Sequence, residues 1–223
     1  MRGLMRLVVR TYLAGLFHLE GEDRVPAAGG LLVCSNHAST VDPPLVPAFL
    51  PRGDSWSMAK SEYFARRSFM RWLVTTYHAF PVVRHSADRR ALRRATEILD
   101  GGHALVVYPE GTRVESGGLR RAEPGAGFLA RASRAAVQPV GLVGTRQCFP
   151  KGAHWPRRVP VAVRFGHPLR IKQQRPDGRR VENQEAADAI MLAIAELLPE
   201  GMRGDYSDLD VLRQRLGGVS EPA

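Results

Sequence analysis

A histidine and an aspartate five residues apart, His37 and Asp42, form the first pattern in this sequence that could support catalysis. A histidine takes up a proton near neutral pH, and a carboxylate that accepts its second ring proton fixes the tautomer and stabilises the imidazolium. Because a separation of five does not place two side chains on one face of a helix, the pair can meet only across a turn. The pattern predicts a general base, His37, oriented by Asp42. A simpler interpretation is that Asp42 caps a helix that Pro43 begins.

A second polar turn, Pro109–Arg113 (PEGTR), follows a valine-rich run. Backbone N–H groups in such a turn, together with the Thr112 hydroxyl, suit an anion, and the Arg113 guanidinium can bind two of its oxygens. The turn therefore predicts a binding site for a phosphate or carboxylate. The simpler interpretation is a surface ion pair between Glu110 and Arg113, which contributes little to stability.

A third apolar run, Phe80–Val83, also ends in an arginine, Arg84. Its simpler interpretation is an exposed surface side chain. Three successive runs nevertheless end in His37, Arg84 and Glu110, and ligands of open α/β sheets bind in the crevice beyond the strand ends. We therefore expect these three side chains to lie near one another.

The elements that must position these residues are short apolar runs alternating with helical stretches. The runs are mostly rich in valine and leucine, which is typical of strands covered on both faces. The predicted strands are Gly30–Ser35, Ser55–Ala59, Phe80–Val83, Ala104–Tyr108, Val137–Val143 and Val159–Phe165. The predicted helices are Phe64–Thr75, Ala87–Leu99, Gly127–Arg134, Glu182–Leu198 and Ser207–Leu216. This alternation predicts an α/β fold with a mostly parallel central sheet covered by helices.

Composition limits the class of protein. The chain has 223 residues, 44% of them hydrophobic, which is enough for one domain with a sizeable core. Its formal net charge of +10, carried almost entirely by arginine, favours an anionic partner such as nucleic acid, an acidic membrane, a phosphorylated substrate or an acidic carrier protein. Two cysteines exclude a disulfide framework and a four-thiolate zinc site. No apolar run reaches the roughly 18 residues of a membrane-spanning helix.

The N-terminus predicts an amphipathic helix, in which Arg2, Arg6 and Arg10 form one stripe. The helix either lies in the interface of an anionic membrane, with these arginines on the acidic lipid, or packs on the domain as an ordinary amphipathic helix. We divide the chain into this helical segment at 1–19, a domain at 20–217 and a flexible tail at 218–223.

Four blocks occur in order along the chain and carry a resemblance to a known family. They are Asn36-His37-x4-Asp42, Phe80–Arg84, Pro109–Arg113 and Val137–Val140. Together they resemble the glycerolipid acyltransferases, the family of 1-acyl-glycerol-3-phosphate acyltransferase, over roughly residues 20–170. Four ordered blocks are more specific than any one of them alone.

The resemblance implies transfer of a fatty acyl group from acyl-CoA or an acyl-carrier-protein thioester to the hydroxyl of 1-acyl-glycerol-3-phosphate, giving phosphatidate for phospholipid biosynthesis. It makes His37 the general base and Asp42 its partner, and it implies a peripheral enzyme at the cytoplasmic face of the cell membrane, on an anionic lipid surface. No cofactor and no metal are implied, because the thioester is a co-substrate. The implied substrate-binding residues are Asn36, Arg84, Glu110, Gly111, Thr112 and Arg113.

Three departures from the family pattern motivate a second hypothesis. His78 stands where the second block usually opens on glycine, Val83 replaces an acidic residue, and Val114 replaces a serine or threonine. The same chemistry on a different lysophospholipid or a specialised alcohol is therefore the alternative. Net charge alone motivates a nucleic-acid-binding protein, but the basic residues are spread along the chain and no strand combines aromatic with basic residues. We therefore expect no nucleic-acid partner.

Overall fold

The computed structural model describes residues 2–64, 69–83, 88–114 and 116–223. Within these residues, nine strands form one sheet in the order β1, β7, β6, β2, β5, β3, β4, with β8 beside β6 and β9 beside β8. The strands are β1 Phe17–Glu20, β2 Leu31–Ser35, β3 Ser55–Lys60, β4 Ala79–Val82, β5 Ala104–Val107, β6 Ala136–Val143, β7 Val161–Phe165, β8 Leu169–Ile171 and β9 Ser220–Pro222. Five adjacent strands, β6, β2, β5, β3 and the edge strand β4, all run parallel.

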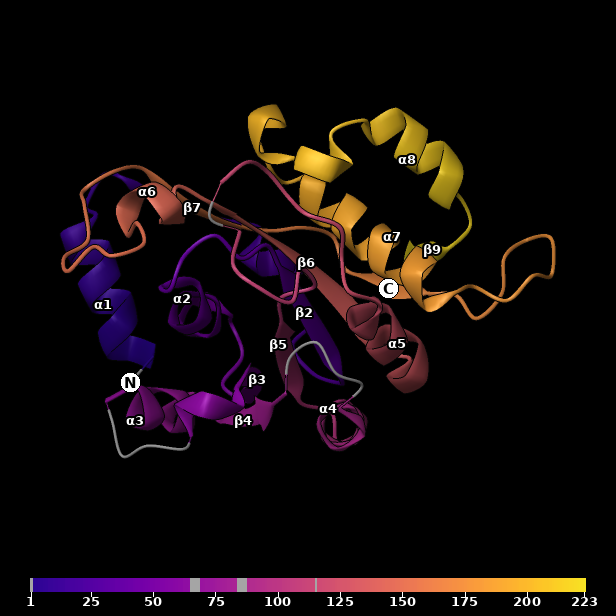
Figure 1. Ribbon diagram of the computed structural model, residues 1–223, viewed down its shortest axis with the longest axis horizontal. Helices are drawn as coiled ribbons and strands as arrows, with labels where there is room; N and C mark the ends of the chain where they lie inside the picture. The colour runs from indigo at the N-terminus through magenta and orange to yellow at the C-terminus, as the bar shows by residue number, and fades with distance from the viewer. Residues whose placement is uncertain (1, 65–68, 84–87, 115) are drawn as a thin grey trace.

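Helices cover both faces of the sheet (Figure 1). They are α1 Arg2–Tyr12, α2 Asp42–Phe49, α3 Phe69–Thr76, α4 Arg89–Asp100, α5 Pro124–Ser133, α6 Thr145–Cys148, α7 Asn183–Ala195 and α8 Leu209–Leu216. Alternate residues of the central strands enter two separate cores: Leu32 and Leu105 pack with α4, α5 and α7, whereas Leu31 packs with α2. The fold predicted from the sequence, an α/β protein with a mostly parallel sheet, is therefore confirmed.

The ends of the chain differ from the prediction. The N-terminal helix ends at Tyr12, and β1 begins within the segment that we had assigned to it. Gly15, with φ of 76°, allows the intervening turn. Residues 218–223, expected as a flexible tail, include β9, which pairs with β8 through Arg170 and Glu221. Strands this short pair through backbone hydrogen bonds and leave no side-chain period in the sequence.

Two of the three arginines of the α1 stripe, Arg2 and Arg6, pack against the protein, whereas Arg10 is exposed. Arg2 donates to the Ser55 hydroxyl at 2.6 Å, and Arg6 donates to the carbonyls of Ala48 and of Leu50, the latter at 3.0 Å, where α2 ends. Cations are stabilised at these unpaired carbonyls. Arg2 and Arg6 therefore do not form the outward stripe that we expected to contact acidic lipid.

The opposite face of α1 is apolar and exposed. Leu4, Leu7 and Val8 are 61%, 64% and 52% exposed. Among the described residues, no helix combines the length and the hydropathy needed to cross a bilayer.

Two backbone details shape the region around the site. Gly127 lets α5 approach α7, because a Cβ there would lie 2.0 Å from the Asn183 carbonyl oxygen. His78 adopts φ of 51°, the left-handed region that glycine enters without strain. The residue that departs from the family's glycine thus keeps a glycine-like backbone, and its ring packs on Trp56 with centroids 5.4 Å apart.

Candidate active site

The turn after β2 is held to the neighbouring strand by Asn36. Its side-chain amide donates to the Leu142 carbonyl at 2.9 Å, and its carbonyl oxygen accepts from the Leu142 N–H at 2.7 Å. Both ends of this buried amide therefore bind β6. The expectation that Asn36 binds substrate is not supported, and its observed contacts hold the turn in place.

His37 and Asp42 meet across this turn. His37 Nδ1 lies 3.0 Å from Asp42 Oδ2, and the same oxygen accepts from the N–H groups of Ala38 at 2.7 Å and Ser39 at 2.6 Å. Because a carboxylate oxygen with two backbone donors is an acceptor for the ring, Nδ1 carries the proton and Nε2 keeps its lone pair. Asp42 is the first residue of α2, and it makes no side-chain bond of an N-cap. The simpler interpretation of Asp42 as a helix cap is therefore wrong.

Tyr108 fixes the plane of the histidine ring. The two rings stack with centroids 4.3 Å apart and planes inclined by 30°. The register places Cys34 of β2 beside Val107 of β5, so the turns that follow these neighbouring strands lie together. Tyr108 directly precedes the third block, but no role followed from the sequence because the stacking depends on this register.

Glu110 is buried and binds backbone rather than Arg113. Its two carboxyl oxygens accept from the N–H groups of His37 at 2.9 Å and Arg120 at 3.0 Å. Burial raises the pKa of Glu110 to about 7, while these two hydrogen bonds and the charge of Arg146 act in the opposite direction. The simpler interpretation of an exposed Glu110–Arg113 pair is therefore wrong. Arg146, on α6, is a neighbour of the site that the sequence did not reveal.

The raised pKa of Glu110 predicts a pH-dependent loss of stability. The folded state holds the proton more tightly than the unfolded chain, so stability falls as pH rises toward the folded pKa of about 7. The shift corresponds to about 3 kcal/mol in the free energy of unfolding. Denaturant titrations of wild type and Glu110→Gln at several pH values measure this loss. The wild type should lose stability relative to the variant between about pH 4 and about pH 8; a pH-independent difference would contradict the assignment.

The rest of the third block passes close to the histidine. Gly111 has φ of 68°, which makes the turn possible, and the Val114 N–H donates to the His37 carbonyl at 2.8 Å. Thr112 and Arg113 are half-buried beside it. Arg113 forms no hydrogen bond or ion pair with any residue that the structure describes. Arg84, the other predicted anion ligand, lies outside the described residues.

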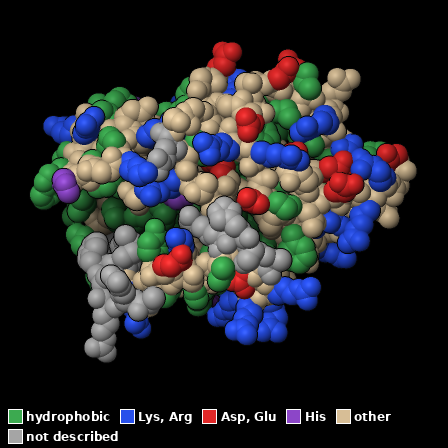
Figure 2. Space-filling model, viewed as in Figure 1, with side chains coloured by type: hydrophobic (Ala, Val, Ile, Leu, Met, Phe, Trp, Pro, Cys, Tyr) green, Lys and Arg blue, Asp and Glu red, His purple; other side chains and the backbone are tan. Residues whose placement is uncertain are grey.

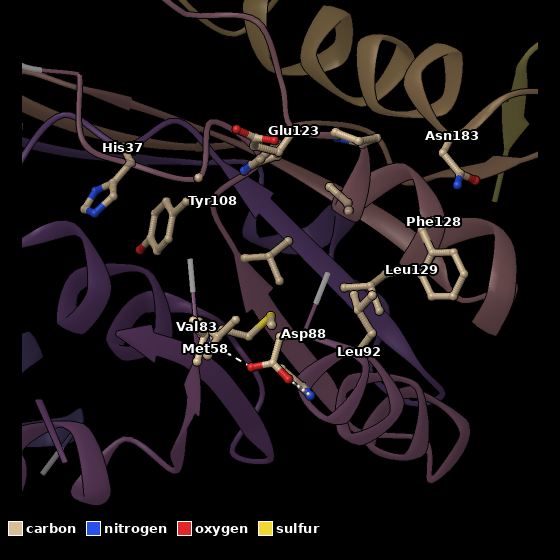
Figure 3. A pocket seen from close by; sticks show the side chains of 18 residues that line it. His37, Met58, Val83, Asp88, Leu92, Tyr108, Glu123, Phe128, Leu129 and Asn183 are labelled. Carbon is tan, nitrogen blue, oxygen red and sulfur yellow. Dashed lines mark hydrogen bonds between the residues drawn. The ribbon is translucent and has the colours of Figure 1, made fainter. Parts of the chain in front are cut away.

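A cavity of about 710 Å³ opens beside these turns. His37 and Tyr108 lie at one end, and Phe128 and Asn183 lie at the opposite end (Figure 3). Most of its wall is apolar and comes from β3, β4, β5, α4 and α5: Met58, Val82, Ala91, Leu92, Val107, Ala126, Phe128 and Leu129. In the described part of the chain, no three His, Cys, Asp or Glu side chains are grouped to hold a metal ion. The arrangement suits a ligand with a long apolar chain, one end of which would lie beside His37 as a general base.

Comparisons with known proteins agree with this geometry. The family model Acyltransferase matches residues 17–143, which include the turns that carry His37 and Glu110. The chloroplastic 1-acyl-sn-glycerol-3-phosphate acyltransferase LPAT1 of Arabidopsis thaliana is 27% identical over 139 residues, 61% of this chain and 38% of that protein. A 1-acyl-sn-glycerol-3-phosphate acyltransferase of Limnanthes douglasii is 30% identical over 138 residues, 60% of this chain and 48% of that protein. The chain thus spans less than half the length of these relatives.

A solved structure shares the fold. The crystal structure of the 1-acyl-sn-glycerophosphate acyltransferase PlsC from Thermotoga maritima aligns with a TM-score of 0.67 and 24% sequence identity. The alignment covers 88% of this chain and 79% of that one. The likeness therefore extends over most of the fold of this chain.

Proposed function

Since this chain belongs to the acyltransferase family, we propose that it transfers a fatty acyl group from a thioester to the hydroxyl of 1-acyl-glycerol-3-phosphate, giving phosphatidate. One observation carries the proposal: a buried histidine, held by a carboxylate through Nδ1, lies at the end of a long apolar cavity. The names of the plant relatives support the choice of acceptor.

In the proposed reaction, Nε2 of His37 takes the proton of the acceptor hydroxyl while the oxygen attacks the thioester carbonyl. The tetrahedral adduct then expels the thiolate, which receives the proton from the imidazolium, and an ester and a free thiol result. Asp42 keeps Nδ1 protonated and offsets the positive charge that develops on the ring. Tyr108 prevents the ring from turning away. The reaction needs no group beyond acyl-CoA or an acyl-carrier-protein thioester as co-substrate.

The cavity fits the acyl chain of the donor. Its apolar wall removes the chain from water, which contributes about 0.8 kcal/mol for each buried methylene group. The reacting carbonyl then lies at the His37 end of the cavity (Figure 3).

Arg113 is the proposed ligand of the acceptor's phosphate, because it is a half-buried cation beside His37 that has no hydrogen bond or ion pair within the described part of the chain. Arg113→Ala should raise KM for 1-acyl-glycerol-3-phosphate by about 10–100-fold, the size of a lost charged hydrogen bond. The KM for monoacylglycerol, which has no phosphate, should stay unchanged. Arg121→Ala, an exposed arginine nearby, is the control.

A panel of acceptors assayed with one acyl-CoA tests both the Arg113 assignment and the choice of acceptor. An equal rise in KM for both acceptors, or none, would place the phosphate elsewhere. A higher kcat/KM for another lysophospholipid or a specialised alcohol would favour the alternative acceptor that the three departures motivate.

We place the enzyme at the cytoplasmic face of a membrane, where its lipid acceptor resides. The outward apolar face of α1 supports a membrane location, because contact with lipid would remove the exposed side chains of Leu4 and Leu7 from water. Arg6, which already binds protein, would not have to enter the lipid. In this proposal residues 2–12 contact lipid, and the domain that follows carries the reaction.

A further inference from the structure

The loop that follows α6, residues 150–158, presents a tryptophan to solvent. The Trp155 side chain is 83% exposed, more than any other large hydrophobic side chain among the described residues. A fully hydrated indole is unfavourable, and such residues mark surfaces that meet a partner or a lipid interface. The loop contributes nothing to the cavity beside His37, so the proposed reaction leaves Trp155 unexplained.

The loop is held in place by its own contacts. The Arg157 N–H donates to the Cys148 carbonyl at 2.7 Å and closes the loop at its base, and the Ala153 N–H donates to the Pro150 carbonyl at 3.1 Å. The Tyr12 hydroxyl of α1 donates to the Pro156 carbonyl at 2.7 Å. Trp155 therefore projects from a supported loop that is fastened to α1.

The charges of the loop are of one sign. Lys151, Arg157 and Arg158 are exposed around Trp155, and residues 149–160 contain no Asp or Glu. Hydrophobic and basic side chains lie together at the left end of Figure 2, where Figure 1 places α1 and the loop. An indole flanked by cations fits the boundary of an anionic bilayer, where the ring reaches the headgroup level and the cations meet acidic lipid.

We propose that the 150–158 loop is a second lipid-contact site, in which Trp155 inserts at the interface and Arg157 and Arg158 bind anionic headgroups. The proposal rests on the membrane location given above and extends it from one helix to a two-part face, α1 and the loop. Lipid is favoured over a second copy of the chain because the like charges of two such loops would repel each other.

This face shares its support with the reaction site. The Ser39 hydroxyl, in the turn between His37 and Asp42, donates to the carbonyl of Phe149 at 2.9 Å, at the start of the loop. The loop is therefore joined by a hydrogen bond to the turn that holds the general base.

Sedimentation with vesicles of phosphatidylcholine, with and without phosphatidylglycerol, tests the proposal on the full chain. Trp155→Ala should weaken partitioning about ten-fold on both kinds of vesicle, as expected when one large apolar side chain is lost from the interface. Arg157→Gln with Arg158→Gln should weaken binding roughly 25-fold on the anionic vesicles and little on the neutral ones.

Two matched controls lie on other surfaces. Val211→Ala removes an apolar side chain that is 57% exposed on α8, and Arg89→Gln with Arg90→Gln removes two adjacent exposed charges on α4. Neither control should change vesicle binding. Transfer to a short-chain soluble acceptor should be the same in Trp155→Ala as in wild type, since the loop does not line the cavity.

The outcomes separate this inference from the proposal on which it rests. Wild-type chain that fails to bind either kind of vesicle would overturn the membrane location and this site together. Wild-type binding that is lost in Leu4→Ser with Leu7→Ser but unchanged in Trp155→Ala would overturn the loop site alone. A Trp155→Ala variant that loses self-association in gel filtration while binding vesicles normally would assign the surface to a second copy instead.

Discussion

His37→Ala is expected to lower kcat/KM for phosphatidate formation by about 10²–10⁴-fold, the usual contribution of a positioned general base. The histidine lies beside the cavity with Nδ1 engaged by Asp42, so Nε2 alone is left to accept the proton of the acceptor. The KM values should change less than kcat, because the ring acts on the transition state more than on binding. Release of free thiol from acyl-CoA, followed with a thiol reagent, measures the rate.

The matched control for this variant is His167→Ala, which removes an exposed histidine outside the cavity. It should retain full activity, and circular dichroism should show both variants folded. Turnover of His37→Ala close to that of wild type would mean that another group, or water, removes the proton.

Asp42→Asn is expected to lower kcat/KM by about 10²–10⁴-fold, although the substitution hardly changes the volume of the side chain. The Asp42 Oδ2 oxygen that faces His37 Nδ1 also accepts from Ala38 and Ser39, so we expect the amide oxygen to keep this place and the NH₂ group to take that of Oδ1. The neutral amide then no longer offsets the positive charge that develops on the ring when His37 takes the proton of the acceptor. The acidic limb of the pH–rate profile should also move to lower pH, because the imidazolium loses its counter-charge.

The pH profile distinguishes orientation from simple support of the turn. A variant that only loosened the turn would lower the rate at all pH values without moving the limb. An unchanged limb together with wild-type kcat/KM would show that Asp42 does not act on the histidine.

Much of the fold could be predicted because its signals are local. Strands such as β2 and β5 are continuous valine- and leucine-rich runs, and they lie within a residue or two of the predicted ranges. The pairing of His37 with Asp42 also follows from spacing, since five residues suffice to close one turn. The sequence does not predict the short strands β1, β8 and β9, because three or four residues leave too little side-chain period to recognise.

The remainder of the site depends on contacts that no local pattern encodes. The Asn36 amide binds Leu142, which lies 106 residues away in the sequence. No local pattern indicates that contact, and the residue type of Asn36 and its place in the block are those of a substrate ligand. Leu92 and Leu129 have the spacing of helix core residues, yet both line the cavity, because α4 and α5 leave a space between them. The N-terminal arginines also depend on distant contacts. Their spacing predicts a stripe along the helix, but the carbonyls at the end of α2 turn Arg6 toward the protein instead of toward solvent.

In the proposed reaction, this chain forms an ester directly from a thioester and a lysophospholipid hydroxyl. The most direct measurement incubates purified protein with isotope-labelled acyl-CoA and 1-acyl-glycerol-3-phosphate and follows the lipid product by mass spectrometry. We expect labelled phosphatidate, formed in step with free thiol and only when the acceptor is present. Thiol release at the same rate without the acceptor, with free fatty acid as the product, would contradict it.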